Sequence, residues 1–303
     1  MKEGFENINC PVCRNDQHQL FLNTFDRFAA TKINEFQIVK CTNCGFIFLN
    51  PRPDTETASQ YYDVDGYDPF LSADQSQSLR DKFYLFLRKL NLAFKFKKIR
   101  GFKPKPGKIL DIGCATGEFL EKYQKHLWQC TGVEVAEKAG QIASAKNIKV
   151  FQSVHEIPDT EKFDLITMWH VLEHVHDLNE TIGKIGKLIK KDGILVIAVP
   201  NIHSWDAGVY KSDWVALDAP RHLYHFSPDS IQKLLQKQNL KLRHKHTLLL
   251  DNLYNNLLSK NLCGAGFGFF VKNLVKSLVK TYFGSVDNSS SIVYYFSPEV
   301  NNE

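Results

Sequence analysis

The sequence predicts an α/β protein with a doubly wound, mostly parallel seven-stranded sheet and a small N-terminal zinc ribbon. From Lys108 onward, short apolar runs alternate with helical patterns, which is typical of parallel α/β sheets. Two Cys-x2-Cys pairs precede this region, and a Pro- and Tyr-rich connector with a basic helix separates the two parts. We therefore expect a zinc ribbon over residues 1–55, a connector and basic helix over 56–105, and the sheet over 106–303, with an insertion at about 255–288.

The two cysteine pairs predict a metal site. Cys10 and Cys13 enclose two residues, as do Cys41 and Cys44, and 27 residues separate the pairs. Thiolates at this spacing hold one tetrahedral ion, and two such pairs complete a four-sulfur site without an open position. We therefore expect a structural zinc ion in a reducing compartment. Two unrelated thiol pairs are the alternative, and a redox dithiol is disfavoured because neither pair lies in a βαβ context.

Composition and charge indicate an ordinary globular chain with two basic patches. Of the 303 residues, 43% are apolar and 23% are charged. The sequence opens without an apolar leader, and no uncharged apolar run reaches the roughly 18 residues of a membrane span, so we expect a cytoplasmic protein. The net charge is +5, but residues 80–108 carry +10 and residues 252–286 carry +4. Such patches favour phosphate groups or the inner surface of an anionic membrane as partners.

The central region contains seven strand patterns, separated by helical patterns at residues 117–128 and 178–191 among others. Ligands of such sheets bind at the carboxyl ends of the strands, beside the first strand. The predicted strands are KILDIG (108–113), CTGVEV (130–135), KVFQS (149–153), FDLITMW (163–169), GILVIAVPN (193–201), LRHKHTLLL (242–250) and SSIVYYFSP (290–298).

The loop after the first of these strands predicts a cofactor site. In DIGCATGEF, Gly113 and Gly117 bracket Ala115, and small residues allow the backbone to approach a ligand closely. Glu134 ends the second strand, 21 residues after Gly113, where a carboxylate can accept hydrogen bonds from two ribose hydroxyls. A nicotinamide dinucleotide site would need a third glycine where Glu118 stands, so this pattern departs from it.

The segment HVLEHV, residues 170–175, allows two interpretations. His170, Glu173 and His174 form the H-x-x-E-H pattern of inverted zinc peptidases, in which the ligands must share a helix face. Here His170 directly follows a β-branched and aromatic strand, so the two histidines need not share a face. The sequence favours the other interpretation, in which HVLEHV leaves a strand at the edge of the cofactor site.

These motifs, in this order, resemble the class I S-adenosylmethionine-dependent methyltransferases over about residues 105–250. The resemblance implies a Rossmann-like sheet in which the glycine loop holds the homocysteine part, the acid after the second strand holds the ribose, and Ser153 and Val154 flank the adenine. Ala115 stands where the family often has glycine, and a shifted backbone is expected there. The implied cofactor-binding residues are Asp111, Gly113, Cys114, Ala115, Gly117, Glu134, Val135, Ser153, Val154, Trp169 and His170.

A second resemblance concerns the acceptor side. The N/D-P-P-Y motif of methyltransferases that act on base amino groups is absent, and MWHV stands in its place. The segment PRHLYHFS, together with the paired cysteines, resembles zinc-ribbon methyltransferases that modify deoxysugars and related glycan or antibiotic precursors. A histidine that titrates near neutrality suits the base that takes the acceptor's proton. We expect His225 as this base, then His222, then His174, with Tyr67, Trp205, Trp214, Arg221 and Tyr224 as acceptor-binding residues.

The sequence therefore predicts methyl transfer from S-adenosylmethionine to oxygen or carbon of a sugar, a glycan precursor or a similar small metabolite, phosphate-bearing or lipid-linked. An RNA methyltransferase is the first alternative, disfavoured by only eight arginines. An inactive zinc-ribbon binding module is the second. A basic amphipathic helix at residues 271–282 either packs its apolar stripe on the core or contacts an anionic membrane. The acceptor's identity, oxygen versus carbon, and the oligomeric state stay open. A quinone or another small aromatic acceptor is a further alternative, because EHV (173–175) also resembles small-molecule O-methyltransferases.

Overall fold

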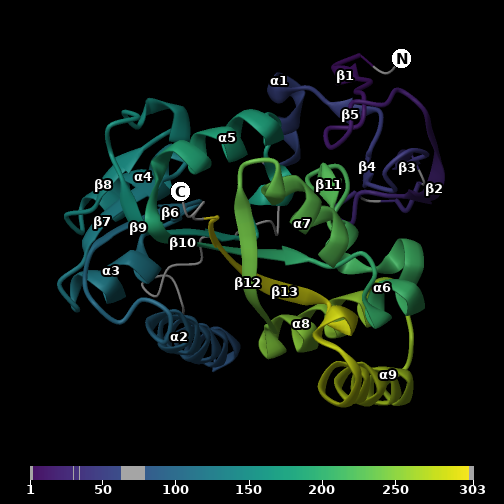
Figure 1. Ribbon diagram of the computed structural model, residues 1–303. Helices are drawn as coiled ribbons and strands as arrows, with labels where there is room; N and C mark the ends of the chain where they lie inside the picture. The colour runs from purple at the N-terminus through teal and green to yellow at the C-terminus, as the bar shows by residue number, and fades with distance from the viewer. Residues whose placement is uncertain (1–2, 30, 34, 63–78, 300–303) are drawn as a thin grey trace.

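The computed structural model describes residues 3–29, 31–33, 35–62 and 79–299 (Figure 1). A seven-stranded sheet lies at its centre, in the order β12-β13-β10-β9-β6-β7-β8. Only β13 is reversed, since it runs antiparallel to both β10 and β12 while the other neighbouring strands are parallel. The strands are β6 (Lys108–Ile112), β7 (Gln129–Val133), β8 (Lys149–Phe151), β9 (Phe163–Trp169), β10 (Ile189–Pro200), β12 (Leu240–Thr247) and β13 (Ser291–Pro298).

The α-helices of the described residues are α1 (Thr55–Ala58), α2 (Leu79–Arg100), α3 (Glu118–Gln124), α4 (Glu137–Ser144), α5 (Leu178–Leu188), α6 (Trp205–Tyr210), α7 (Pro228–Gln236), α8 (Leu249–Leu262) and α9 (Phe267–Val279). They cover both faces of the sheet. Side chains of α5 and α7 join one buried apolar cluster, and those of α2 and α3 join another. In β6, Ile109 faces the second cluster and Leu110 the first, as the two-residue period of a strand requires. The predicted doubly wound, mostly parallel sheet is confirmed.

Short helical segments complete the connections between these elements. They lie mainly where the chain leaves a strand or reverses direction, as tight single turns usually do. The 3-10 segments are η1 (Ser59–Tyr61), η3 (Val154–Glu156), η4 (Leu172–His174), η5 (Lys211–Asp213), η6 (Val215–Leu217) and η8 (Val286–Asn288), and η7 (Lys280–Gly284) is a π-helical turn.

The N-terminal region shares a sheet with the rest of the chain. The strands β2 (His18–Thr24), β3 (Phe36–Cys41) and β4 (Ile47–Leu49) are extended by β11 (Tyr224–His225), which pairs antiparallel with β4. A separate two-stranded ladder joins β1 (Phe5–Glu6) and β5 (Arg52–Pro53). The expected ribbon is thus not self-contained, because the segment that carries the predicted acceptor residues supplies its edge strand.

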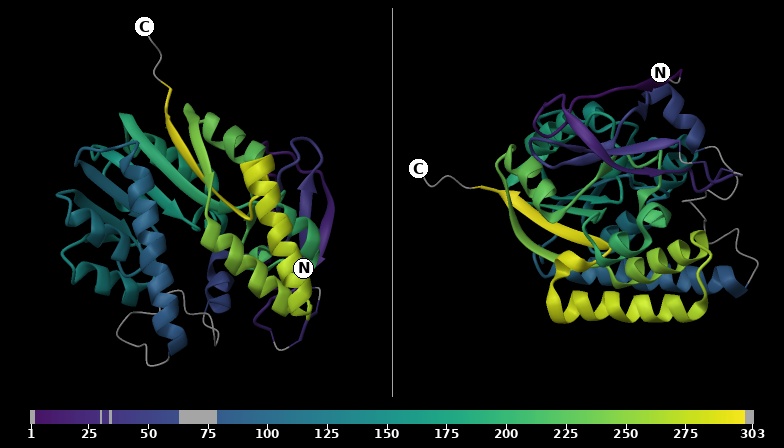
Figure 2. Two further views of the ribbon diagram at one scale, coloured as in Figure 1. Left: turned by 90° about the horizontal axis from the view of Figure 1, so that it is seen from below. Right: turned by 90° about the vertical axis from the view of Figure 1, so that its right-hand side faces the viewer.

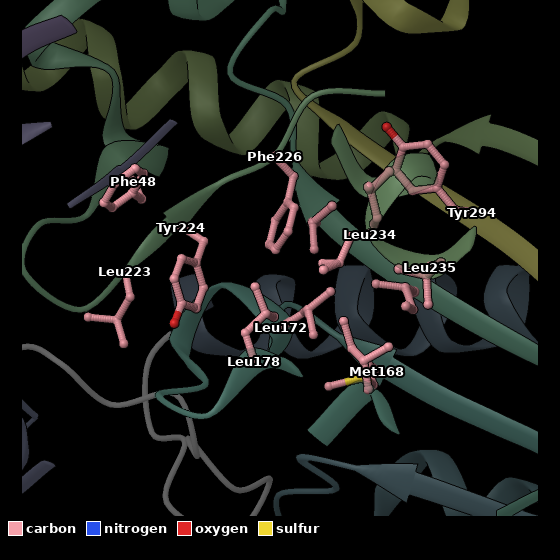
Figure 3. Close-up of a cluster of buried hydrophobic side chains, with 14 of the residues drawn as sticks. Phe48, Met168, Leu172, Leu178, Leu223, Tyr224, Phe226, Leu234, Leu235 and Tyr294 are labelled. Carbon is pink, nitrogen blue, oxygen red and sulfur yellow. The ribbon is translucent and has the colours of Figure 1, made fainter. Parts of the chain in front are cut away.

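Figure 3 shows the core that this shared sheet encloses. Phe48 of β4 lies with Tyr224 and Phe226 from the β11 segment, above Leu172 and the α5 residue Leu178. The ring centroids of Tyr224 and Phe226 each lie within 6.0 Å of that of Phe46. Burial of such aromatic and aliphatic side chains stabilises by roughly 1.5–3 kcal/mol each, so the N-terminal strands are held against the central sheet by a continuous core.

Two segments differ from the sequence-based expectation. Strand β10 begins at Ile189 rather than Gly193, because Ile189 already pairs with Phe163 of β9 before a register shift that ends at Ile194. Residues 201–228, expected to be largely irregular, form α6, two 3-10 turns and β11, and most of their side chains are buried. Their partners lie far away in sequence, so no local pattern announces them.

Between β12 and β13 lie α8 and α9, which run along the underside of the molecule near α2 (Figure 2). The side chains that they bury are mainly polar: Asn252, Asn256 and Ser259 on α8, and Phe270, Asn273 and Ser277 on α9. Their apolar side chains are largely exposed, among them Leu249, Leu253, Tyr254, Leu257, Phe267, Phe269, Val271, Val275 and Val279. Among the described residues, no helix combines the length and apolar character that crossing a membrane requires.

Candidate active site

The loop after β6 is tightly packed. Gly113, Ala115 and Gly117 all have left-handed backbone conformation, with φ of +74°, +50° and +76°. A Cβ at Gly113 would lie 2.3 Å from Cγ2 of Val171, and a Cβ at Gly117 would lie 2.7 Å from Cδ1 of Ile148. Glycine is therefore needed at both positions, whereas Ala115 adopts this region at a cost of about 1–2 kcal/mol. The contact with Val171 brings the HVLEHV segment directly against the loop.

Glu134 fastens this loop to the end of β7. Its side chain is buried, and its two carboxylate oxygens accept hydrogen bonds from the backbone N–H of Ala115 at 2.8 Å and of Ala136 at 2.9 Å. A carboxylate offers about four acceptor positions, so lone pairs remain for further donors. The arrangement suits the predicted role of this residue, since a cofactor's two ribose hydroxyls are donors of this kind.

Asp111 lies beneath the loop, in β6. It is buried, and the hydroxyl of Thr167 on β9 donates to its Oδ1 at 2.5 Å. Burial raises the pKa of Asp111 to about 7, although the Thr167 hydrogen bond lowers it. This carboxyl therefore couples two central strands and changes its charge near neutral pH.

His170, the first residue after β9, has φ of +56° and bridges two acids. Its Nε2 donates to Oδ2 of Asp251 at 2.8 Å, and its Nδ1 lies 3.4 Å from Oε1 of Glu173. Burial lowers the pKa of His170, but the two carboxylates outweigh it and raise the pKa to about 9. The imidazole is thus a cation at neutral pH, held between α8 and the η4 segment.

Glu173, His174 and His222 form a cluster beside His170. One ligand atom from each lies within 4.8 Å of the others, and the rings of His174 and His222 are 4.6 Å apart. Nδ1 of His174 lies 3.1 Å from the carbonyl oxygen of Arg221 and 2.9 Å from the hydroxyl of Tyr62, and Nδ1 of His222 donates to the carbonyl of Ala216 at 2.8 Å. Burial, and then His222, lower the pKa of His174 to about 4. The side chain of His174 is therefore a neutral imidazole. When its Nδ1 donates to the Arg221 carbonyl, its Nε2 carries a lone pair.

His225 lies in β11, with its backbone paired to Ile47 of β4. Its side chain is buried, and its Nε2 has no hydrogen-bond partner among the described residues. Burial, together with the neighbouring His222, lowers the pKa of His225 to about 3, whereas Glu173 acts in the opposite direction. His225 is therefore neutral at physiological pH and can accept a proton.

The family model described as a methyltransferase domain matches residues 78–245, which is more than half of the chain. The chain belongs to this methyltransferase family. The ubiquinone biosynthesis O-methyltransferase of Glaesserella parasuis is 35% identical over 128 residues, which are 38% of this chain and 53% of the relative. The same-named protein of Pelagibacter ubique is 28% identical over 187 residues, 57% of this chain and 76% of that one. The chain thus spans about half the length of the first of these relatives.

Solved structures show the same fold. Magnesium protoporphyrin IX methyltransferase from Synechocystis, with bound S-adenosylhomocysteine, superposes with a TM-score of 0.53 at 12% identity, covering 81% of this chain and all of that one. A second solved structure, StiE O-MT, gives a TM-score of 0.51 at 12% identity, covering 76% of this chain and 81% of that one. The predicted enzyme class, an S-adenosylmethionine-dependent methyltransferase, is confirmed at the level of the family.

The other predicted cofactor residues of the methyltransferase lie along the same edge of the sheet. Cys114 and Val154 are buried, whereas Val135 is 82% exposed directly after Glu134. The Ser153 hydroxyl accepts from the N–H of His155 and begins the η3 turn. The Trp169 ring has Nζ of Lys95, from α2, 4.1 Å from its centroid. The contact of these five residues with the cofactor stays a prediction.

Several predicted acceptor residues lie inside the methyltransferase rather than on an open surface. The guanidinium of Arg221 donates to Asp26 and Asp218 and stacks on Phe28, and its side chain is fully buried. Trp214 is 2% exposed. The Tyr224 hydroxyl accepts from Arg52 and donates to the carbonyl of His176, and the Trp205 indole donates to Asn273. Tyr67 lies outside the described residues. The structure therefore brings the three histidines near one another, and the acceptor-binding roles of the other residues stay predictions.

The four N-terminal cysteines of the methyltransferase form one cluster. The sulfurs of Cys10 and Cys44 are 3.5 Å apart, those of Cys13 and Cys41 are 3.4 Å apart, and all four lie within 4.8 Å of one another. Four sulfurs at about 2.3 Å from a tetrahedral ion are separated by similar distances, so the residues present fit a zinc ion.

The sequence interpretation missed three residues at the site. Asp251 lies 81 positions from His170 in the sequence, in an apolar run without an acidic motif. Lys95 was visible only as part of a basic helix. Glu173 belongs to the H-x-x-E-H pattern of residues 170–174. Carboxylates are seldom buried in an apolar segment without a role, and this signal could have identified it as a site residue.

Proposed function

We propose that the chain transfers the methyl group of S-adenosylmethionine to an oxygen or carbon of a sugar, a glycan precursor or a similar small metabolite. The observation that supports this is His225, a neutral side chain whose Nε2 has no hydrogen-bond partner among the described residues. It lies beside Glu173 and His222, and the nearby Val171 touches the glycine loop. An O-methyltransferase relative is consistent with a hydroxyl acceptor. The finer choice of acceptor comes from the sequence resemblance to zinc-ribbon sugar methyltransferases.

The cofactor supplies an activated methyl group, and the chain supplies position and a proton acceptor. Glu134 and the glycine loop would hold the ribose and homocysteine parts. As a lone pair of the acceptor forms the new bond to the methyl carbon, the bond to sulfur breaks and its electron pair stays on sulfur. The acceptor's proton passes to Nε2 of His225. The carboxylate of Glu173, which raises the pKa of His225, stabilises the resulting imidazolium.

The experiment is a methyl-transfer assay with labelled S-adenosylmethionine against nucleotide sugars, lipid-linked sugars, small phenols and RNA. We expect transfer to a hydroxyl-bearing small molecule, and a roughly 100-fold or greater rate loss in His225→Ala with unchanged cofactor binding. His244→Ala, which changes an exposed histidine on β12, is the matched control. Methyl transfer to RNA alone would contradict the proposed small-molecule acceptor. Turnover of His225→Ala at the wild-type rate would show that His225 is not the base.

We propose that the cysteine cluster holds a structural zinc ion. The support is its four-sulfur composition and spacing, which match closed zinc sites. Pro11, between Cys10 and Cys13, accepts a hydrogen bond from Asn179 at the start of α5, so the cluster would brace the N-terminal strands against the central domain. Metal analysis should give one zinc ion fewer per chain in Cys10→Ser than in the wild type. A metal-free, fully folded wild-type protein would contradict this.

We also propose that the protein meets its acceptor at an anionic membrane surface, through α8 and α9. Helix α9 exposes Phe267 (74%) and Val275 (53%) and carries Lys272 and Lys276, also exposed. There is no acidic residue from 252 to 286. An apolar face beside lysines is the combination that binds anionic lipid. We expect the protein to cosediment with anionic vesicles at low salt and not with neutral vesicles. Failure to cosediment with either kind of vesicle would contradict the proposal.

A further inference from the structure

The carboxylate of Glu173 is fully buried, and neither of its oxygens has a hydrogen-bond partner within the described part of the chain. A buried carboxylate in this state costs several kcal/mol unless a cation compensates it. His170 approaches one oxygen at 3.4 Å, but it forms its shorter contact, 2.8 Å, with Asp251. Lys95 from α2 also lowers the pKa of Asp251, so Glu173 is the carboxylate left with the longer His170 contact.

The two histidines beside Glu173 are oriented as metal ligands are. In metal sites, a ligating imidazole almost always donates its other ring N–H to a carbonyl, carboxylate or water, which fixes the tautomer. The Nδ1 of His174 donates to a backbone carbonyl, and so does the Nδ1 of His222. In the tautomer that these two carbonyls select, each ring keeps its lone pair on Nε2.

The cluster is also held rigidly. Glu173 and His174 follow β9 on the η4 turn, and the N–H of Leu223 donates to the Glu173 carbonyl at 2.8 Å. The segment after His222 is therefore tied to the η4 turn and, through β11, to the N-terminal sheet. Rigid placement of ligands from two segments is what a metal site requires.

We propose that Glu173, His174 and His222 bind a divalent transition-metal ion, with at least one coordination position left for the acceptor's oxygen. Two imidazoles and one carboxylate suit zinc and similar first-row ions, and three protein ligands are usual where a position stays open. This inference builds on the proposed function and specifies its acceptor, a group with an ionisable or metal-coordinating hydroxyl.

Such an ion would explain how a weakly basic His225 takes the acceptor's proton. A metal-bound hydroxyl is far more acidic than a free one. The acceptor oxygen would lose its proton to Nε2 of His225 while its lone pair forms the bond to the methyl carbon. The ion itself neither gains nor loses electrons.

The experiment is metal titration and metal analysis of the full chain, read independently of methyl transfer. We expect two zinc equivalents in the wild-type protein, one in Glu173→Gln and one in His222→Ala, with affinity at the lost site reduced roughly 100-fold or more. Cys10→Ser should lose the other equivalent, and His244→Ala should keep both. Cobalt substitution separates the two sites, because only the cysteine site has thiolate-to-metal charge-transfer absorption.

Binding of a single equivalent that Cys10→Ser abolishes and His222→Ala leaves intact would overturn the proposal. Calorimetry of the folded wild-type protein, preloaded with one zinc ion, needs no variant: a further equivalent supports the site, and no further heat contradicts it. If the protein binds a second ion but methylates none of the acceptors tested, the metal site is supported and the proposed function is contradicted.

Discussion

The central sheet layer and the α8–α9 insertion are packed in opposite ways. Helix α5, on the sheet, buries Ile182 and Ile185 and exposes Glu180, as amphipathic helices of globular proteins do. Helix α9 buries Asn273 and Ser277 and exposes Val271 and Val275. A lysine-bearing amphipathic pattern alone thus does not tell which face points inward, because polar side chains can form the packed face when they satisfy one another.

Asp206 shows how the inverted packing is stabilised. Its carboxylate accepts hydrogen bonds from Ser290 at 2.6 Å, Ser277 at 3.1 Å and Asn273 at 3.3 Å. Asn273 also donates to Asn256 at 2.6 Å. A fully connected buried network of this kind fixes the helices in one position without apolar burial. The apolar face of the insertion is consequently left for another surface.

The largest expected effect comes from the two buried aspartates, one in each region. Burial raises the pKa of both, but Asp111 has one hydroxyl donor and its pKa reaches about 7, whereas Asp206 has a full set of donors. An acid whose pKa is raised by folding binds its proton more tightly in the native state. Stability should therefore fall as pH rises from about 4 to 7, by roughly 4 kcal/mol for Asp111.

The measurement is the free energy of unfolding against pH for the wild type and Asp111→Asn. The difference between them should carry this slope and be flat above about pH 7. The same experiment on Asp206→Asn should give a shallower slope. Identical slopes in wild type and Asp111→Asn would show that this carboxyl is ionised throughout.

The next effect concerns the apolar packing of α5. Ile185 is completely buried, so Ile185→Ala should lower the free energy of unfolding by about 3 kcal/mol, from lost transfer energy and the cavity left behind. Ile142→Ala on α4, where the side chain is 44% exposed, is the control and should change it by less than about 1 kcal/mol. Denaturant titration measures both, and equal losses would mean that burial does not decide the cost.

A smaller loss is expected from the polar packing. Asn256→Ala removes an acceptor used by Tyr210 and Asn273 and should cost about 2 kcal/mol, because it leaves those buried groups unpaired. The adjacent Asn255, only half-buried, supplies the matched control, Asn255→Ala. If the two variants were equally stable, the buried network would not be what holds α8 and α9 together.

The smallest effect on stability, and the clearest on binding, is expected at the exposed face of α9. Val275→Asp should change the free energy of unfolding by no more than about 0.5 kcal/mol. It should nevertheless weaken cosedimentation with anionic vesicles, since it adds a negative charge to the docking face. Ile142→Asp, on α4, should leave vesicle binding unchanged; equal losses would point to a nonspecific charge effect.

The contrast between the regions also explains what could be predicted from the sequence. The strands β6 to β9 and the glycine loop were located closely, because β-branched runs, the left-handed glycines and an acid at the end of a strand are local signals. The orientation of α9 could not be predicted in this way, because Asn273 and Ser277 are buried by hydrogen bonds to Asp206, more than 60 positions away in the sequence. The same holds for His170 and Asp251, and for β11, whose two residues pair with a strand near the N-terminus.

The central claim is that the loop after β6 and Glu134 form the pocket of an S-adenosylmethionine-dependent methyltransferase. Titration calorimetry of S-adenosylhomocysteine tests it most directly, with NADH as the ligand control and Glu137→Gln, an exposed neighbour on α4, as the variant control. We predict binding of one equivalent, no binding of NADH, and a loss of roughly tenfold or more in Glu134→Gln. Absence of binding to the folded protein, or undiminished binding by Glu134→Gln, would contradict the account.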